Sequence, residues 1–137
     1  MSPEPTQVIR RYLDALLAGD LDTIRDSFNI DAVWSMHGDL PLAGPWHGRD
    51  QIVDGFLRKL GATLFEPGSQ SFEFPTMVAA GDTIALEWRV KARSAAGVEY
   101  DNAYCGFFVI RAGRIQEVRE YLDTRYAAAA LYPGLEQ

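Results

Sequence analysis

The first thirty residues alternate apolar and polar side chains with the period of an α-helix. Apolar residues recur three and four positions apart from Val8 to Leu17, which predicts an amphipathic helix. Gly19 follows where that helix should end. Asp20 is a suitable N-cap for a second short helix over residues 21–28, whose apolar side chains share one face.

The pattern then changes to a strand, a loop and a third helix. Residues 31–36, DAVWSM, are rich in β-branched and aromatic side chains and predict a strand. Residues 38–48, GDLPLAGPWHG, combine prolines and glycines and predict a loop. A helix is expected from about Arg49 to Leu60, because apolar residues recur there every four positions.

From Gln70 onward the period is that of β-strands. Turn signals at 79–82, 95–97 and 111–113 separate long runs rich in Val, Ile, Phe, Tyr and Trp, and such short connections join antiparallel strands. Helices followed by strands indicate an α+β fold. We expect one domain over residues 1–137: a cone-shaped, curved, mixed or antiparallel β-sheet with three N-terminal helices packed on its concave side, enclosing a pocket.

Composition narrows the class of protein. A content of 47% hydrophobic residues in 137 residues suits one folded domain. The net charge of −6 without a basic run argues against binding to nucleic acid or a membrane surface. Cys105 is the single cysteine, which excludes an intrachain disulfide and fits a reducing compartment. No apolar segment is long enough for an export signal or a membrane span, so we expect a cytoplasmic protein.

Three stretches of sequence resemble a known superfamily: RRYLDALLAGDLDTIRDSF, DAVWSMHGDLPLAGPWHGRDQI and YDNAYCGFFVIRAGRIQEVREYLDT. Over roughly residues 6–126 the chain resembles the SnoaL-like branch of the nuclear transport factor 2-like superfamily. That superfamily also contains ketosteroid isomerases, limonene epoxide hydrolases and scytalone dehydratase. The resemblance implies the cone fold, which hosts many chemistries and also non-enzymes.

The pattern of ketosteroid isomerases is only partly present. By this resemblance Tyr12 matches the oxyanion-hole tyrosine, but Met36 and Cys105 stand where that family keeps its two catalytic acids. Without a base beside the substrate, steroid isomerisation is excluded. Scytalone dehydratase would need paired histidines deep in the cone, whereas His37 and His47 both lie beside the Pro/Gly loop.

The pattern of limonene epoxide hydrolases is half present. Arg89 and Glu120 match that family's arginine and one of its two acids, but Lys91 occupies the position of the other acid. Trp34 and Met36 replace the tyrosine and asparagine that position water. Epoxide opening therefore remains one possibility among several.

Glu120 is the central candidate residue. Val118, Glu120 and Leu122 share one face of a strand, so Glu120 should point into the cone. A lone buried carboxylate is unfavourable, so Arg89, inward by the same alignment, is its expected partner. The pair is either a structural ion pair or part of a catalytic site, and arginine would lower the pKa of the carboxyl.

Two further residues are candidates for catalysis. His37 is a possible acid–base, with Asp39 forming a dyad, or else a half-exposed residue at a strand end. Tyr12 is either a hydrogen-bond donor to the substrate or a core residue.

The alternation of strands assigns the remaining residues to two faces. We expect the pocket to be lined by Trp34, Met36, Cys105, Phe107, Val118 and Leu122, which would otherwise be plain core. The opposite face would carry a homodimer contact made by Asn102, Tyr104 and Tyr121.

The sequence thus predicts a cofactor-independent enzyme acting on a small, mostly apolar molecule by acid–base chemistry. Isomerisation, cyclisation, dehydration and epoxide opening all belong to this class. Neither histidine has metal-ligand spacing and there is no Gly-rich phosphate loop, so we expect no metal and no cofactor. The alternative is a non-catalytic module that binds a small molecule or dimerises.

Overall fold

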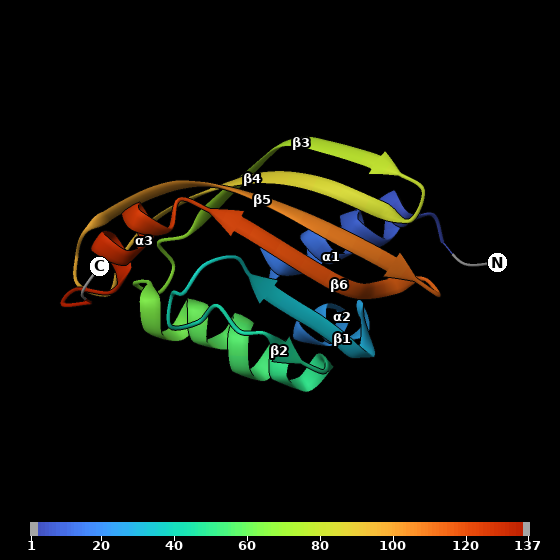
Figure 1. The fold of residues 1–137 in the computed structure, drawn as a ribbon, viewed down its shortest axis with the longest axis horizontal. Coiled ribbons are helices and arrows are strands. Elements are labelled where there is room, and N and C mark those ends of the chain that lie inside the picture. Colours follow the sequence, from blue (N-terminus) through green and yellow to red (C-terminus); the bar gives the residue numbers. More distant parts are fainter. Residues whose placement is uncertain (1–2, 136–137) are drawn as a thin grey trace.

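The computed structural model describes residues 3–135 and has the α+β architecture expected from the sequence. Six strands form one mixed sheet in the order β2-β1-β6-β5-β4-β3. β1 runs parallel to β6, and every other neighbouring pair is antiparallel. Figure 1 shows the four long strands of the C-terminal half crossing the molecule side by side.

The two N-terminal helices begin and end as their sequences predict. α1 (Pro5–Ala18) carries proline in its first turn and ends at Gly19, whose φ of 70° is the left-handed conformation that glycine adopts easily. α2 (Leu21–Asp26) is capped by Asp20, whose carboxylate accepts a hydrogen bond from the backbone N–H of Thr23.

The third helical stretch is longer than expected, covering residues 49–64. It consists largely of two π-helical segments, η1 (Gln51–Leu57) and η2 (Leu60–Leu64). Arg25 of α2 ties it to the N-terminal helices through ion pairs of 2.7 Å with Asp50 and Asp54. Apolar residues of this stretch, among them Ile52, face the core, which is why the four-residue spacing was a correct guide.

The strands confirm the expected meander, and the structure differs from the expectation in the start of β1 and in one additional short strand. β3 (Ser71–Ala80), β4 (Thr83–Arg93), β5 (Glu99–Arg111) and β6 (Arg114–Leu122) are joined by the three predicted turns. β1 (Phe28–Met36) begins three residues earlier than expected, so Phe28 belongs to a strand and not to the second helix. The predicted loop contains a two-residue strand, β2 (Trp46–His47).

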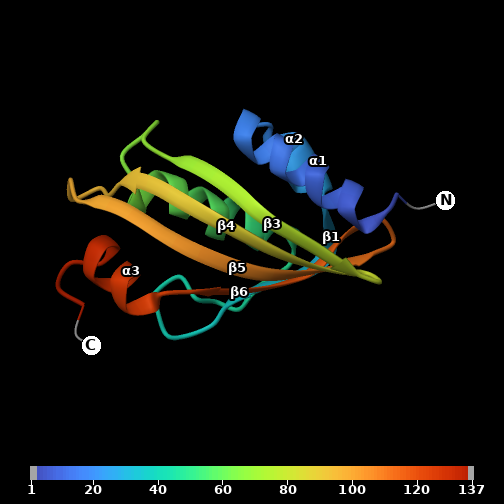
Figure 2. The same ribbon diagram turned by 90° about the horizontal axis from the view of Figure 1, so that it is seen from above.

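A fourth helix, α3 (Thr124–Leu131), was not expected. Asp123 is its N-cap and accepts a hydrogen bond from the backbone N–H of Tyr126. Figure 2 shows α1 and α3 near opposite ends of the long strands. Ala127 and Ala128 of α3 are buried against the sheet.

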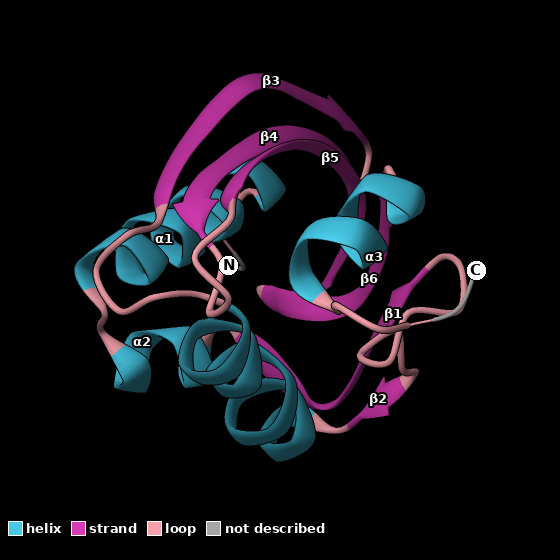
Figure 3. Ribbon diagram, turned by 90° about the vertical axis from the view of Figure 1, so that its left-hand side faces the viewer, coloured by secondary structure: helices cyan, strands magenta, loops and turns pink. Residues whose placement is uncertain are grey.

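The sheet curves around the helices and leaves the core between them. Seen along the strands in Figure 3, β3, β4 and β5 arch over the space that the helices border. The buried side of the sheet supplies the core residues Ile84, Leu86, Phe108, Ile115 and Val118. No helix in the described part of the chain is long and apolar enough to cross a membrane.

Candidate functional site

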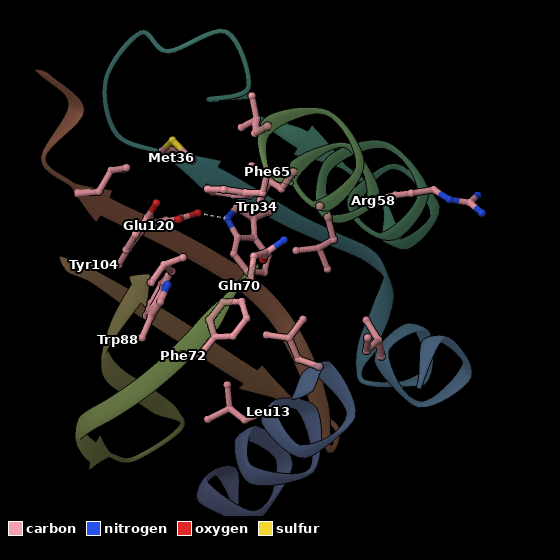
Figure 4. A pocket seen from close by; sticks show the side chains of 18 of the residues that line it. Leu13, Trp34, Met36, Arg58, Phe65, Gln70, Phe72, Trp88, Tyr104 and Glu120 are labelled. Atoms are coloured by element: carbon pink, nitrogen blue, oxygen red, sulfur yellow. Dashed lines mark hydrogen bonds between the residues drawn. The ribbon is translucent and has the colours of Figure 1, made fainter. Parts of the chain in front are cut away.

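A cavity of about 360 Å³ lies between the concave face of the sheet and the helices. Its volume is at the lower end of the roughly 300–1,000 Å³ that is usual for small-molecule sites. Most of its wall is apolar, and its aromatic members are Tyr12, Trp34, Phe65, Phe72, Phe74, Trp88, Tyr104, Phe108 and Tyr132, several of which Figure 4 shows.

The carboxylate of Glu120 in β6 is buried and lines this cavity, as the sequence predicted, whereas that of Asp54 at the cavity's border is about half exposed and pairs with Arg25. Glu120 is 4% exposed and stands between Met36 of β1 and Gly106 of β5 in the register of the sheet. The indole Nε1 of Trp34 donates a hydrogen bond of 2.7 Å to Glu120 Oε1 (Figure 4). Among residues 3–135, Arg49 Nε is the one fully buried side-chain nitrogen or oxygen without a partner. Glu120 Oε2 also has no hydrogen-bond partner among these residues, and because it is not one of the fully buried atoms, it is open to the cavity.

Burial controls the titration of Glu120. Removal of the carboxylate from water raises the pKa of Glu120 from 4.5 to about 7, although the hydrogen bond from Trp34 acts in the opposite direction. No Lys, Arg or His among the described residues pairs with it. The group therefore exchanges a proton near neutral pH inside a mostly apolar space.

Tyr12 of α1 also lines the cavity. The residue is 2% exposed, and its ring packs edge-on against that of Phe28 at 5.5 Å between centroids. Burial, and secondly the negative charge of Glu120, raise the pKa of Tyr12 far above the physiological range. The phenol keeps its hydrogen, and because it too has no partner within the described residues, it is available as a donor to a molecule in the cavity.

Arg89 does not reach Glu120, so the predicted ion pair is wrong. Its Nε lies 2.6 Å from Asp101 Oδ1 on the outer face of the sheet, where both side chains are about half exposed. Trp88 and Val90, the neighbours of Arg89 in β4, are the residues that point inward. Strand alternation then forces Arg89 outward.

The assignment of faces on β5 was wrong by one residue. Cys105 is exposed and Phe107 half-buried on the outer face, and neither lines the cavity. Phe107 packs instead against the ring of Tyr121 and beneath the guanidinium of Arg119. The inward residues of this strand are the even-numbered ones, which include Tyr104.

The surface predicted for a homodimer changes for the same reason. Asn102 and Tyr104 are buried on the inner side, so they cannot form an outer contact. Tyr121 is on the outer face and 39% exposed. Formation of a homodimer itself stays a prediction.

His37 lies outside the cavity, so its predicted role as an acid–base there is wrong. It is exposed just beyond the end of β1, and its ring lies 5.3 Å from that of Tyr121. Among the described residues it makes no hydrogen bond to Asp39. His47 is exposed on β2.

Three of the residues predicted to line the pocket do so: Trp34, Met36 and Leu122. Val118 is fully buried beneath them and serves the core. The sequence reasoning missed Trp88 and Tyr104, whose rings stack at 5.4 Å to form one wall. The inward alternation of Leu86, Trp88 and Val90 in β4 would have found the first.

No group of three His, Cys, Asp or Glu side chains within residues 3–135 is arranged to hold a metal ion. The titratable side chain that is both inside the cavity and able to change charge near neutral pH is Glu120. The site therefore supports chemistry in which one carboxyl gives or takes a proton.

Comparison with known proteins identifies the family. The SnoaL-like domain profile matches residues 9–118. The chain belongs to the SnoaL-like domain family. No curated protein sequence is similar enough to count as a match.

Solved structures of SnoaL-like and related chains share the architecture. An NTF2-like protein from Burkholderia thailandensis is 23% identical, with a TM-score of 0.85 and coverage of 96% of this chain and 99% of that one. An LEH-like epoxide hydrolase from M. tuberculosis is 20% identical, with a TM-score of 0.73 and coverage of 95% and 90%. A SnoaL-like polyketide cyclase candidate from Jannaschia sp. is 14% identical, with a TM-score of 0.78 and coverage of 96% and 93%. These likenesses establish the NTF2-like cone fold.

Proposed function

We propose that this SnoaL-like chain is a cofactor-independent enzyme in which Glu120 moves a proton on a small, neutral, mostly apolar molecule bound in the cavity. The observation that carries the proposal is a buried carboxyl group without a cationic partner, open to an apolar cavity and with a pKa of about 7. A general acid–base works best when its pKa lies near the working pH.

The environment of Glu120 suits proton transfer better than a structural role. A carboxylate kept for stability would be paired with a cation, because an unpaired buried charge is unfavourable. Here one indole N–H is its whole support among the described residues. Residues held at such a cost are typical of functional sites.

The walls of the cavity indicate the kind of substrate. Trp34, Trp88 and Phe108 present aromatic surface, and Arg58, which also borders the cavity, directs its guanidinium away from it (Figure 4). An anion would meet no positive charge from the described residues inside the cavity and would be repelled by ionised Glu120. A neutral, largely apolar molecule is the better fit.

Among the candidate reactions, those that need one acid–base group are favoured. Isomerisation, cyclisation and dehydration each require a proton to be removed, returned or both. The catalytic arrangement of limonene epoxide hydrolases, to which the sequence was compared, needs an arginine that bridges its two acids. Arg89 is instead paired with Asp101 on the outer face of the sheet. The named cyclase candidate and the epoxide hydrolase among the structural relatives support an enzymatic use of this cone.

A generic carbon acid tests the proposal without knowledge of the natural substrate. 5-Nitrobenzisoxazole is flat and neutral, and removal of its carbon-bound proton breaks the ring N–O bond to release a coloured cyanonitrophenolate. We expect the protein to accelerate this reaction with a rate that rises through an apparent pKa of about 7.

The matched variants are E120Q and E117Q. E120Q should abolish the acceleration, whereas E117Q makes the same change on the outer face of β6, where Glu117 pairs with Arg119, and should leave the rate unchanged. Equal rates for the wild type and E120Q would refute the catalytic role and leave a small-molecule-binding module as the function.

A further inference from the structure

The side chain of Tyr104 is held rigidly beside Glu120. Gly106 of β5 stands directly opposite Glu120, and Tyr104 is two residues away on the same inward face, which makes it a diagonal neighbour at roughly 7–8 Å. The Trp88 ring stacks on the Tyr104 ring with only 11° between their planes. A Cβ atom at Gly106 would lie 2.9 Å from the Trp88 ring, so this glycine allows Trp88 to lie where it does.

The hydroxyl of Tyr104 belongs to a short hydrogen-bond chain. Tyr104 Oη lies 2.6 Å from Tyr100 Oη, and Asn102 Nδ2 donates a bond of 2.9 Å to Tyr100 Oη. Asn102 is itself fixed, since its Oδ1 accepts from the backbone N–H of Ala103 and its Nδ2 also reaches the backbone oxygen of Asp123.

Each of the two tyrosine hydroxyls carries one hydrogen. One of these two hydrogens forms the hydrogen bond between the hydroxyls, and the other has no acceptor among the described residues. If Tyr104 donated, the remaining hydrogen would belong to Tyr100, which is 1% exposed and does not line the cavity. An unsatisfied buried O–H is unfavourable. If Tyr100 donates, the remaining hydrogen belongs to Tyr104, which lines the cavity and can offer that hydrogen to a molecule bound there. Burial therefore favours Tyr100 as the donor.

We propose that Tyr104 donates this hydrogen to a carbonyl oxygen of the substrate, with Tyr100 and Asn102 as positioning residues that hold the Tyr104 hydroxyl. The inference rests on the proposed function in taking this cavity as the substrate site. A carbonyl oxygen is a neutral acceptor without a hydrogen of its own, so it matches a donor whose hydrogen has no other acceptor. Hydrogen bonds in a chain polarise one another, which strengthens the terminal donor. The substrate class is then a flat, neutral carbonyl compound.

Binding of a matched pair of probes tests this inference. α-Tetralone and tetralin have nearly the same shape and differ by the carbonyl oxygen. In calorimetric titrations of the wild type we expect tetralone to bind about two- to tenfold more tightly than tetralin, which is the worth of one hydrogen bond. Y104F should remove this preference while the affinity for tetralin changes little, because phenylalanine keeps the stack on Trp88.

Two further variants separate binding from structure. Y100F should reduce the preference partly, since it leaves the Tyr104 hydroxyl in place but unsupported. Y121F, the same change on the outer face, should have no effect. In the infrared spectrum, the carbonyl stretch of bound tetralone should lie at lower wavenumber in the wild type than in Y104F.

The outcomes are decisive in both directions. Equal binding of the two probes to the wild type, no binding of either, or an unshifted carbonyl stretch would overturn the inference, even if Y104F failed to fold. The same titrations on E120Q keep the result independent of catalysis. A retained tetralone preference with no Glu120-dependent turnover would refute the proposed function alone.

Discussion

Trp34 Nε1 donates a 2.7 Å hydrogen bond to Glu120 Oε1, joining the inner faces of two parallel neighbouring strands. This indole is the one side-chain group among residues 3–135 that stabilises the ionised carboxylate, and burial outweighs it. The balance between the two effects sets the protonation of Glu120 near neutral pH, and with it the chemistry available in the cavity.

Substitution of Trp34 by phenylalanine should shift that balance. W34F removes the hydrogen bond but keeps an aromatic ring, so the pKa of Glu120 should rise above about 7. The midpoint of the pH profile for 5-nitrobenzisoxazole opening measures this pKa. W46F is the matched control, since Trp46 donates to the backbone oxygen of Leu42 and not to Glu120. A lower or unchanged midpoint in W34F would show that the indole does not hold the charge.

Stability should depend on pH through the same group. Because the pKa of Glu120 is higher in the folded state than its ordinary value of 4.5, the folded protein binds this proton more tightly than the unfolded chain. The resulting stability is present below pH 4.5 and is lost as the pH rises to about 7, by about 3 kcal/mol in all.

Urea unfolding of the wild type and E120Q over this range isolates the effect, because the other carboxylates titrate alike in both proteins. The difference in unfolding free energy should move in favour of E120Q as the pH rises. A difference that stays constant with pH would contradict the raised pKa.

Gly106 should tolerate no side chain. In G106A the new Cβ would approach two carbons of the Trp88 ring at 2.9 Å and one of Phe108 at 3.1 Å. Such overpacking costs about 1–3 kcal/mol, and displacement of Trp88 should also weaken tetralone binding. G61A is the control, because its Cβ would come no closer than 3.8 Å to Gln70. A G106A variant as stable as the wild type would show that Trp88 moves freely.

Arg89 should be dispensable for the cavity. R89A breaks an exposed ion pair with Asp101, and such pairs contribute little. We expect an unchanged midpoint in the pH profile of 5-nitrobenzisoxazole opening and a melting temperature close to that of the wild type. A shifted pH midpoint would mean that Arg89 reaches Glu120 in solution.

The order of the helices and strands could be predicted from the sequence because it depends on local features such as helix caps and turns. Gly19, Asp20 and the three turns are fixed by backbone conformation and capping. Asp123 before an alanine-rich run is the same kind of capping signal for α3, which the expected order of elements did not include. The three N-terminal helices were found from the period of their apolar residues, with Gly19 and Asp20 marking where the first ends and the second begins.

The sequence predicted which face of a strand a side chain lies on only where one face is apolar and the other polar. Glu120 has apolar neighbours on its own face, and the prediction that it points inward is confirmed. On β5 both faces carry aromatic residues, since Phe107 and Phe108 are adjacent, so alternation could not decide between them. The hydrogen-bond partner of Glu120 lies 86 residues away in sequence, and only the register of β1 on β6 brings Trp34 to it.

The most direct test of this account is the titration of Glu120 itself. Protein labelled with carbon-13 at the glutamate carboxyl gives one signal per side chain, and the signal missing from E120Q identifies Glu120. The account predicts that this signal titrates with a midpoint of about 7. A midpoint near the ordinary value of 4.5 would mean that the carboxylate is hydrated or paired in solution, and a buried acid–base in the cavity would be contradicted.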